Sequence, residues 1–339
     1  MSRASEPVGR RAVLLGAAGV LLGAAGGCAG GPSAGPRTAV SRTGPARAAT
    51  ASAAPSSTPS PSGLPRTTPW RPSSGEVRPE VKRRAVALVE AIGAWPSGRG
   101  GPSAARQEVA ALGLPPALVA QAGPLLPSAD EAVLQVVDAQ YGGILADSAS
   151  VLVVCRQWRR RGGTVRAGGT TVDVRLARTA GGWTVTALHP ARPGAPAATL
   201  PTLAHRVLAE PHVQLPPAAD ADVRSGRIHD SVLKAMLDLA GAHRMYVSVV
   251  RSGHPLHVFG TSRPSDHPKG RAFDVWRIDG HAVVDPATPR SLVDGFMREA
   301  AAAGSYNVGG PLLITGGGTA GRFFSDATHH DHLHIGFTT

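Results

Sequence analysis

Residues 329–337, HHDHLHIGF, hold the most informative side chains of this 339-residue chain. His332, Leu333, His334 and Ile335 alternate polar and apolar residues, which is the two-residue period of a β-strand. Such a strand directs His332 and His334 to one face and Leu333 and Ile335 into a core. Two imidazoles on one strand face can approach a single metal ion or substrate.

A second cluster, SDHPKGRAFD, covers residues 265–274. Asp274 lies in a strand-like run over residues 272–276, and its apolar neighbours point to the opposite face. His267, Asp274 and His334 can therefore supply two imidazoles and one carboxylate. That set is typical of catalytic zinc, whose three protein ligands leave a fourth position for water.

Asp331 is the predicted general base. Zinc lowers the pKa of bound water, so that hydroxide is available near neutral pH. A carboxylate that is not a ligand can then take the proton, and Asp331 stands just before the histidine pair.

The pieces Ser-x-His, Gly-x-Ala-x-Asp and His-x-His occur in order and resemble the D-alanyl-D-alanine carboxypeptidase family of zinc peptidases, to which murein endopeptidases and phage endolysins are related. The resemblance covers roughly residues 225–337. It implies one zinc ion per chain, bound by His267, Asp274 and His334. It also implies an α+β domain of the hedgehog/D-Ala-D-Ala peptidase type, which we expect over residues 201–339.

The same resemblance implies roles for four further residues. Asp331 occupies the position of the family's catalytic acid, and His332 matches a histidine near the scissile carbonyl in some members. Arg251 is the nearest match to an arginine that polarises the substrate carbonyl, although the local order differs. Ser265 either contacts substrate or caps a turn. Residues 281–325 are Gly-rich and depart from the family, so substrate preference does not carry over.

The remaining histidines and the cysteine in the folded region carry weaker signals. His329 and His330 are read mainly as solvated side chains. His254 and His257 are expected on a loop, with a functional role the less favoured reading. Cys155 lies in an apolar strand without a base nearby in sequence, which predicts a buried, unreactive thiol.

Residues 79–200 predict a small α+β accessory domain that acts as a spacer or interaction module. Its strand segment weakly resembles nuclear-transport-factor-like domains.

Local patterns also predict secondary structure along the chain. Ser128 and Glu131 have the spacing of a capping box, and Asp230 is a predicted helix N-cap. Glycine pairs at 162–163 and 181–182 mark turns. Helices are predicted over 79–94, 103–112, 128–140, 230–243 and 288–303, and strands over 150–158, 170–178 and 183–188.

Residues 1–28 predict an export signal. Arg10 and Arg11 precede an apolar stretch that is short for a membrane span, which resembles a twin-arginine signal. Cys28 follows Ala-Gly-Gly, similar to a bacterial lipobox, and is the predicted lipidation site. Residues 29–78 are rich in Ala, Pro, Ser and Thr, typical of a disordered tether. We therefore expect an exported protein, anchored in the cytoplasmic membrane or released to the cell wall.

The composition argues against nucleic-acid binding. The net charge is +12, but half of the excess lies in the first eighty residues, and aromatic residues make up only 4%. With two cysteines, a disulfide scaffold or cysteine-based zinc site is excluded.

The sequence favours an exported zinc peptidase that hydrolyses stem-peptide or cross-link amides of peptidoglycan. One alternative is a non-catalytic metal-containing module that binds cell-wall peptides on the same fold. Another is a structural metal site closed by a fourth ligand, for which His332 and His330 are candidates.

Overall fold

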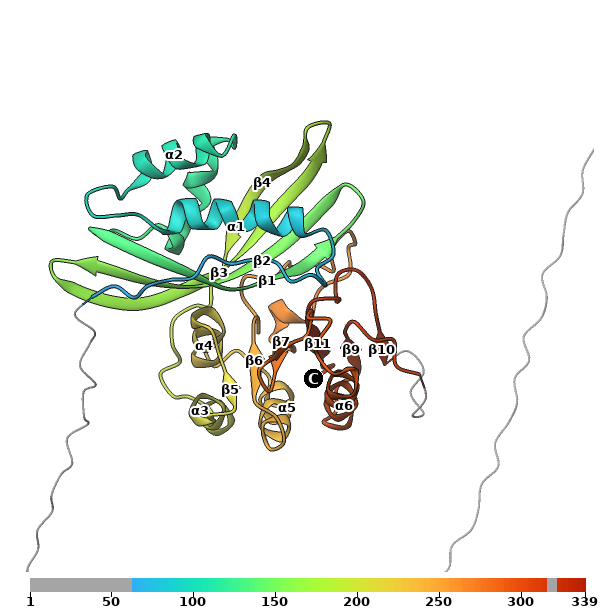
Figure 1. The fold of residues 1–339 in the computed structure, drawn as a ribbon. Coiled ribbons are helices and arrows are strands. Elements are labelled where there is room, and N and C mark those ends of the chain that lie inside the picture. Colours follow the sequence, from blue (N-terminus) through green and yellow to red (C-terminus); the bar gives the residue numbers. More distant parts are fainter. Residues whose placement is uncertain (1–62, 316–321) are drawn as a thin grey trace, which may run out of the picture. The chain divides into compact units, whose positions relative to one another are not determined.

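The computed structural model describes residues 63–315 and 322–339, which belong to one unit, Thr58–Thr339 (Figure 1). The predicted export signal, Cys28 and the linker up to residue 62 lie outside the described residues. Within the described ranges, no helix is long and apolar enough to cross a membrane. The chain forms a mixed α+β fold with two sheets.

The first sheet is an antiparallel meander of four strands in chain order. The strands predicted within it are confirmed, and each extends further than the sequence pattern indicates. Positive φ angles at Gly162, Gly163 and Gly182 confirm the predicted turns, since glycine adopts that region without a steric penalty. The strands are β1 (Glu131–Ile144), β2 (Ser148–Arg161), β3 (Thr164–Thr179) and β4 (Gly182–Pro190).

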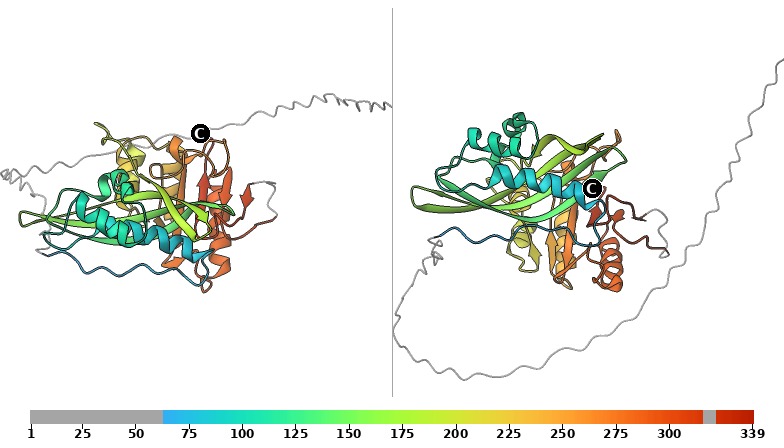
Figure 2. Two further views of the ribbon diagram at one scale, coloured as in Figure 1. Left: turned by 90° about the horizontal axis from the view of Figure 1, so that it is seen from above. Right: turned by 45° about the horizontal axis from the view of Figure 1, so that its top comes forward.

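Two α-helices and two short 3-10 helices cover one face of this sheet, and the second sheet lies toward the other face (Figure 2). α1 buries an apolar stripe at helical spacing against the strands. Cys155 lies in this core, where burial raises the pKa of its thiol to about 12, as expected for an unreactive cysteine. The helices are α1 (Pro79–Gly93), α2 (Pro102–Ala111), η1 (Pro116–Gln121) and η2 (Gly123–Leu125).

The predicted helix over residues 128–140 is wrong, because most of this segment belongs to β1. Burial alternates from residue 131 to 136, and the ladder with β2 runs from the Glu131–Arg160 pair to the Ile144–Ala149 pair. Pairing with the fourteen-residue strand β2 stabilises the extended conformation of this segment more than a capping box, which acts on one helix end, stabilises a helix. The N-cap prediction for Asp230 is also wrong, since Asp230 is the first residue of its helix and His229 precedes it.

The predicted linker over 29–78 does not extend to residue 78 in the structure. Thr68 exchanges two backbone hydrogen bonds with the side chain of Gln135, and Trp70 packs on the core beneath α1. Glu76 forms an ion pair with the buried Lys82. Residues of this segment therefore have partners on β1, on α1 and in the core that their local composition does not show.

The second sheet has the order β10-β9-β11-β7-β6-β5, with β8 paired to β7. The helices predicted over 230–243 and 288–303 are confirmed as α5 and α6, which pack with α3 and α4 on one core (Figure 1). The elements are α3 (Thr202–Ala209), β5 (Val213–Gln214), α4 (Pro217–Arg224), α5 (Asp230–Ala240), β6 (Met245–Val247), η3 (His267–Lys269), β7 (Ala272–Ile278), β8 (His281–Ala282), α6 (Arg290–Ala302), β9 (Asn307–Gly309), β10 (Phe323–Phe324) and β11 (Leu333–Gly336).

Candidate metal centre

Two neighbouring strands of the second sheet bring Asp274 and His334 together. β7 and β11 pair antiparallel, and their register places His334 directly opposite Asp274. Leu333 and Ile335 are fully buried, as the alternation predicts. Directly opposed side chains on one face of a sheet lie close enough to interact, so the strand register itself assembles half of the centre.

His267 completes a compact group of three donor atoms. Its Nε2 lies 3.1 Å from His334 Nδ1 and 3.1 Å from Asp274 Oδ1, and the last two atoms are 3.2 Å apart. Zinc with bonds of about 2.0–2.1 Å in a tetrahedron separates its ligand atoms by roughly 3.3 Å. The three donors therefore have the spacing of three corners of a zinc tetrahedron.

The protonation of these groups suits a metal. His267 Nδ1 lies 2.9 Å from the Val250 carbonyl and donates to it, so Nε2 is the ring nitrogen that faces the other donors. Burial lowers the pKa of His334 to about 4, so this ring is neutral near pH 7. Burial raises the pKa of Asp274, but the rings of His267 and His332 outweigh that effect and hold the pKa well below its usual range.

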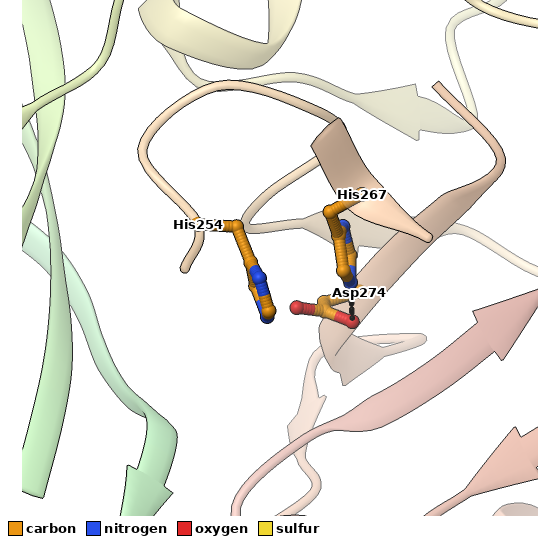
Figure 3. Close-up of side chains that lie close together, drawn as sticks. All are labelled: His254, His267 and Asp274. Atoms are coloured by element: carbon orange, nitrogen blue, oxygen red, sulfur yellow. Dashed lines mark ion pairs between the residues drawn. The ribbon is translucent and has the colours of Figure 1, made fainter. Parts of the chain in front are cut away.

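His254 adds another donor from the loop that follows β6. One ligand atom each of His254, His267 and Asp274 lies within 4.8 Å of the others, and this group can hold a metal ion (Figure 3). The His254 ring stacks on His267 with centroids 4.1 Å apart. Burial, together with His267, lowers the pKa of His254 well below its usual value. A loop histidine that the sequence analysis weighted low thus belongs to the centre.

His332 lies beside the ligand group with a fixed ring orientation. Its Nδ1 lies 2.6 Å from Asp331 Oδ1, and its Nε2 is 3.8 Å from Asp274 Oδ2. In the neutral form of the ring, this carboxylate keeps the proton on Nδ1, and Nε2 faces the centre. Burial lowers the pKa of His332, yet Asp274 and Asp331 more than compensate, so that its pKa is raised.

Both oxygens of Asp331 already have partners. Oδ1 accepts from His332, while Oδ2 accepts from the Tyr141 backbone N–H at 3.0 Å and lies 2.5 Å from Lys82 Nζ. Lys82, on α1, is fully buried and also pairs with Glu76. Burial raises the pKa of Asp331, but Lys82 and His332 reverse this and hold it below the usual value. Asp331 is therefore an anchored anion rather than a free acceptor.

The four-stranded sheet also touches a candidate ligand, Asp274, directly. Gln140, on β1, donates from Nε2 to Asp274 Oδ2 at 2.7 Å, and its Oε1 accepts from the Ser248 hydroxyl. All three side chains are almost completely buried. The first sheet thus supplies a hydrogen-bond partner to the centre of the second.

A groove of ≈ 1090 Å³ runs between β3–β4 and the loop 251–261, with His254 in its wall. Arg175 and Arg192 contribute positive charge to it. Asp173 binds Arg175 through both oxygens, whereas the Arg192 side chain is exposed. The groove is therefore of a size typical of ligand-binding clefts, and Arg192 offers an exposed cation in its lining.

Three other residues considered in the sequence analysis, Arg251, Ser265 and His329, lie outside the group of three close donor atoms. Arg251 lines the groove, but its Nη2 donates to the Pro193 carbonyl at 2.6 Å. Ser265 Oγ accepts from the His267 backbone N–H and lies 3.3 Å from His254 Nδ1, which fits the turn-capping reading. His329 is bound to Asp326, with its ring 5.3 Å from that of His332.

Sequence reasoning missed Lys82, Gln140 and the Tyr141 amide. A lysine in a helix and a glutamine in a strand normally face solvent, so neither residue type is a signal by itself. His254 carried a weak signal, since it lies between the strand β6 and the cluster over residues 265–274 that holds two candidate ligands.

Comparison with known proteins adds no assignment. No protein-family model, no curated protein and no solved structure matches the chain.

Proposed function

We propose that this chain is a zinc-dependent peptidase that hydrolyses stem-peptide or cross-link amide bonds of peptidoglycan. One zinc ion per chain would be held by His267 Nε2, Asp274 Oδ1 and His334 Nδ1. The observation that carries the proposal is the mutual spacing of these atoms, 3.1–3.2 Å, beside an oriented third imidazole, that of His332. The resemblance of residues 225–337 to D-alanyl-D-alanine carboxypeptidases, including their fold type, belongs to the same proposal.

The donor set favours zinc over harder cations. Two imidazole nitrogens and one carboxylate oxygen suit zinc, whereas magnesium and calcium prefer oxygen ligands. When bound, zinc would supply a Lewis acid toward water and toward a peptide carbonyl.

In this proposal, the proton acceptor is His332 rather than Asp331. The Nε2 lone pair of His332 faces the centre, and Asp331 orients the ring from the other side. Asp331 is held in place through Oδ2 by Lys82 and the Tyr141 amide, and its Oδ1 faces His332. An imidazole oriented by a carboxylate is a recurrent general base in its neutral form, and the raised pKa of His332 predicts that this form, and with it cleavage, increases as pH rises above the ordinary imidazole range.

The groove between β3–β4 and the loop 251–261 would admit the substrate. It reaches His254, which stacks on the ligand His267, so a peptide in it approaches the centre from the loop side. Arg192 would attract a carboxylate of the substrate. Export, and lipidation at Cys28, would place the enzyme on the outer face of the cytoplasmic membrane or in the cell wall.

His254 favours a second candidate function, a metal-containing module that binds cell-wall peptides without cleaving them. With His254 as a fourth protein ligand, the centre would be closed, as structural zinc sites are. In that case the groove would serve recognition alone.

The test is zinc content together with digestion of purified muropeptides, using the full chain. We expect about one zinc per chain in the wild type, loss of zinc in His334→Ala, and loss of cleavage with retained zinc in His332→Ala. His281→Ala, at an exposed histidine of β8, is the control for both readouts. Wild-type protein without zinc after reconstitution would rule out the peptidase.

Cobalt substitution separates the two candidates. Replacing zinc by Co²⁺ gives visible absorption that reports ligand number and type. If His254→Ala leaves the spectrum of the cobalt form unchanged, the centre has an open position and the peptidase is favoured. A marked spectral change, with no cleavage by the wild type, favours the binding module.

A further inference from the structure

We propose that Gln140 is a positioning residue of the metal centre, so that the four-stranded sheet sets the metal affinity of the second sheet. This inference rests on the metal site of the proposed function, but not on peptide cleavage. It gives the accessory layer a role other than that of a spacer.

The orientation of the Gln140 amide is determined by its two partners. Ser248, fully buried, directs its hydroxyl to Oε1, and Asp274 accepts from Nε2 at 2.7 Å. Rotating the amide by half a turn would place its carbonyl oxygen against an ionised carboxylate. The amide therefore donates to Asp274 Oδ2 and to no other atom of that carboxylate.

This hydrogen bond leaves one oxygen of Asp274 for a metal. Oδ2 is bound by Gln140, while Oδ1 is the oxygen that lies 3.1–3.2 Å from His267 Nε2 and His334 Nδ1. Without Gln140, Oδ2 would be a buried anionic oxygen with no hydrogen-bond donor, and only the contacts of Oδ1 with His267 and His334 would fix the carboxylate. Partners of this kind typically change metal affinity by about 10–100-fold when they are removed.

Two further contacts along β1 keep Gln140 in place. The Tyr141 N–H donates to Asp331, and the Ile144 N–H donates to Thr328 Oγ1 at 3.2 Å. β1 is an edge strand, so these N–H groups would otherwise have no strand partner on that side. Three anchors within five residues hold the first sheet to the segments that carry the candidate ligands.

The chain contains a matched control for the experiment. Gln157, on β2, is also buried and donates from Nε2 to two backbone carbonyls, those of Gly93 and Leu125, in the helix-covered core. Gln140→Leu and Gln157→Leu each remove a buried amide of the same sheet and keep a similar volume. Only the first removes a partner of a candidate ligand.

The experiment measures the zinc dissociation constant of the full-length wild type and both variants by competition with a chromophoric chelator, together with the cobalt spectrum. We expect Gln140→Leu to weaken zinc binding about 10–100-fold and to shift the cobalt bands, and Gln157→Leu to stay within about threefold of the wild type. If the two variants weaken binding equally, or Gln140→Leu has no effect while the wild type binds zinc, the inference fails and the proposed function stands. A wild type that binds no zinc overturns both.

Discussion

The two faces of the four-stranded sheet each bury a glutamine, and the partners of these glutamines differ in kind. Gln157 satisfies backbone carbonyls at the ends of helical elements, so it serves the fold of its own layer. Gln140 satisfies a candidate metal ligand of the other layer. The same residue type at similar burial thus supports packing on one face and a metal centre on the other, and the environment decides which.

A related contrast exists between the edge and the interior of this sheet. Interior ladder groups pair with neighbouring strands, whereas the free edge of β1 pairs with the segment that carries Thr328 and Asp331. Lys82 reaches the same place from α1 and contributes a charge there. The edge of the sheet is therefore where the two layers exchange polar contacts, and the predictions below test its importance.

The largest expected effect follows from removing the buried ammonium group at this edge. Lys82→Met would leave Asp331 and Glu76 without their cation, which should lower the free energy of unfolding by about 3–5 kcal/mol. Lys82→Arg should lose less, because it keeps the charge. Urea denaturation measures both.

Lys234 gives the matched control for that change. It pairs with Asp238 one helical turn away on an exposed face of α5, so Lys234→Met should cost less than about 0.5 kcal/mol. Equal losses for the two lysines would show that the Lys82 pairs contribute no more than surface pairs.

Metal binding should stabilise the chain by an amount set by mass action. Free zinc at one hundred times its dissociation constant should add about 2.7 kcal/mol to the free energy of unfolding of the wild type. His334→Ala should show no such gain, and the exposed His281→Ala should show all of it. A zinc-dependent gain that persists in His334→Ala would place the metal elsewhere.

The third effect is a dependence of stability on pH. Burial raises the pKa of Asp138, on β1, to about 7, although Lys82 acts in the opposite direction. The folded chain then binds one more proton than the unfolded chain between about pH 4 and 7, so stability falls as pH rises through this window, by about 1.4 kcal/mol per pH unit at most. The pKa of Glu76 is also raised to about 7, so Glu76 makes stability fall with rising pH in the same window. The measurement that isolates Asp138 is therefore the difference in pH dependence between the wild type and Asp138→Asn.

Asp138→Asn should flatten the pH dependence of the free energy of unfolding in metal-free protein. Parallel profiles for the two proteins would contradict the raised pKa of Asp138.

The smallest effect should come from Thr328→Val, which removes one acceptor from the edge of β1. The Ile144 N–H would lose its partner, at a cost of about 1 kcal/mol. Thr261→Val is the control, since that hydroxyl serves its own exposed turn. If Thr328→Val costs no more than Thr261→Val, the anchor at this end of β1 is not significant.

Local sequence patterns accounted for much of the second layer. The alternation over residues 332–335 predicts the placement of His334, and the strand-like run around Asp274 predicts that of Asp274. His267 belongs to the same short cluster as Asp274, so local patterns were enough to propose the three residues as a group. The helices over 79–94, 230–243 and 288–303 were predictable for the same reason. Their apolar residues recur every three or four positions within one short segment, so the pattern is local.

Tertiary structure alone decided the rest. The segment 128–140 has helical signals at its start, yet pairing along β2 makes it a strand. Gln140 lies 134 residues from Asp274, which it contacts. The Tyr141 amide and Lys82 lie still further along the chain from Asp331. No local sequence pattern relates residues at such separations. Sequence by itself determined which residues have the chemistry for a metal centre. Only the fold determined which groups surround them, because hydrogen bonds and ion pairs between distant segments depend on register and layer packing rather than on neighbouring residues.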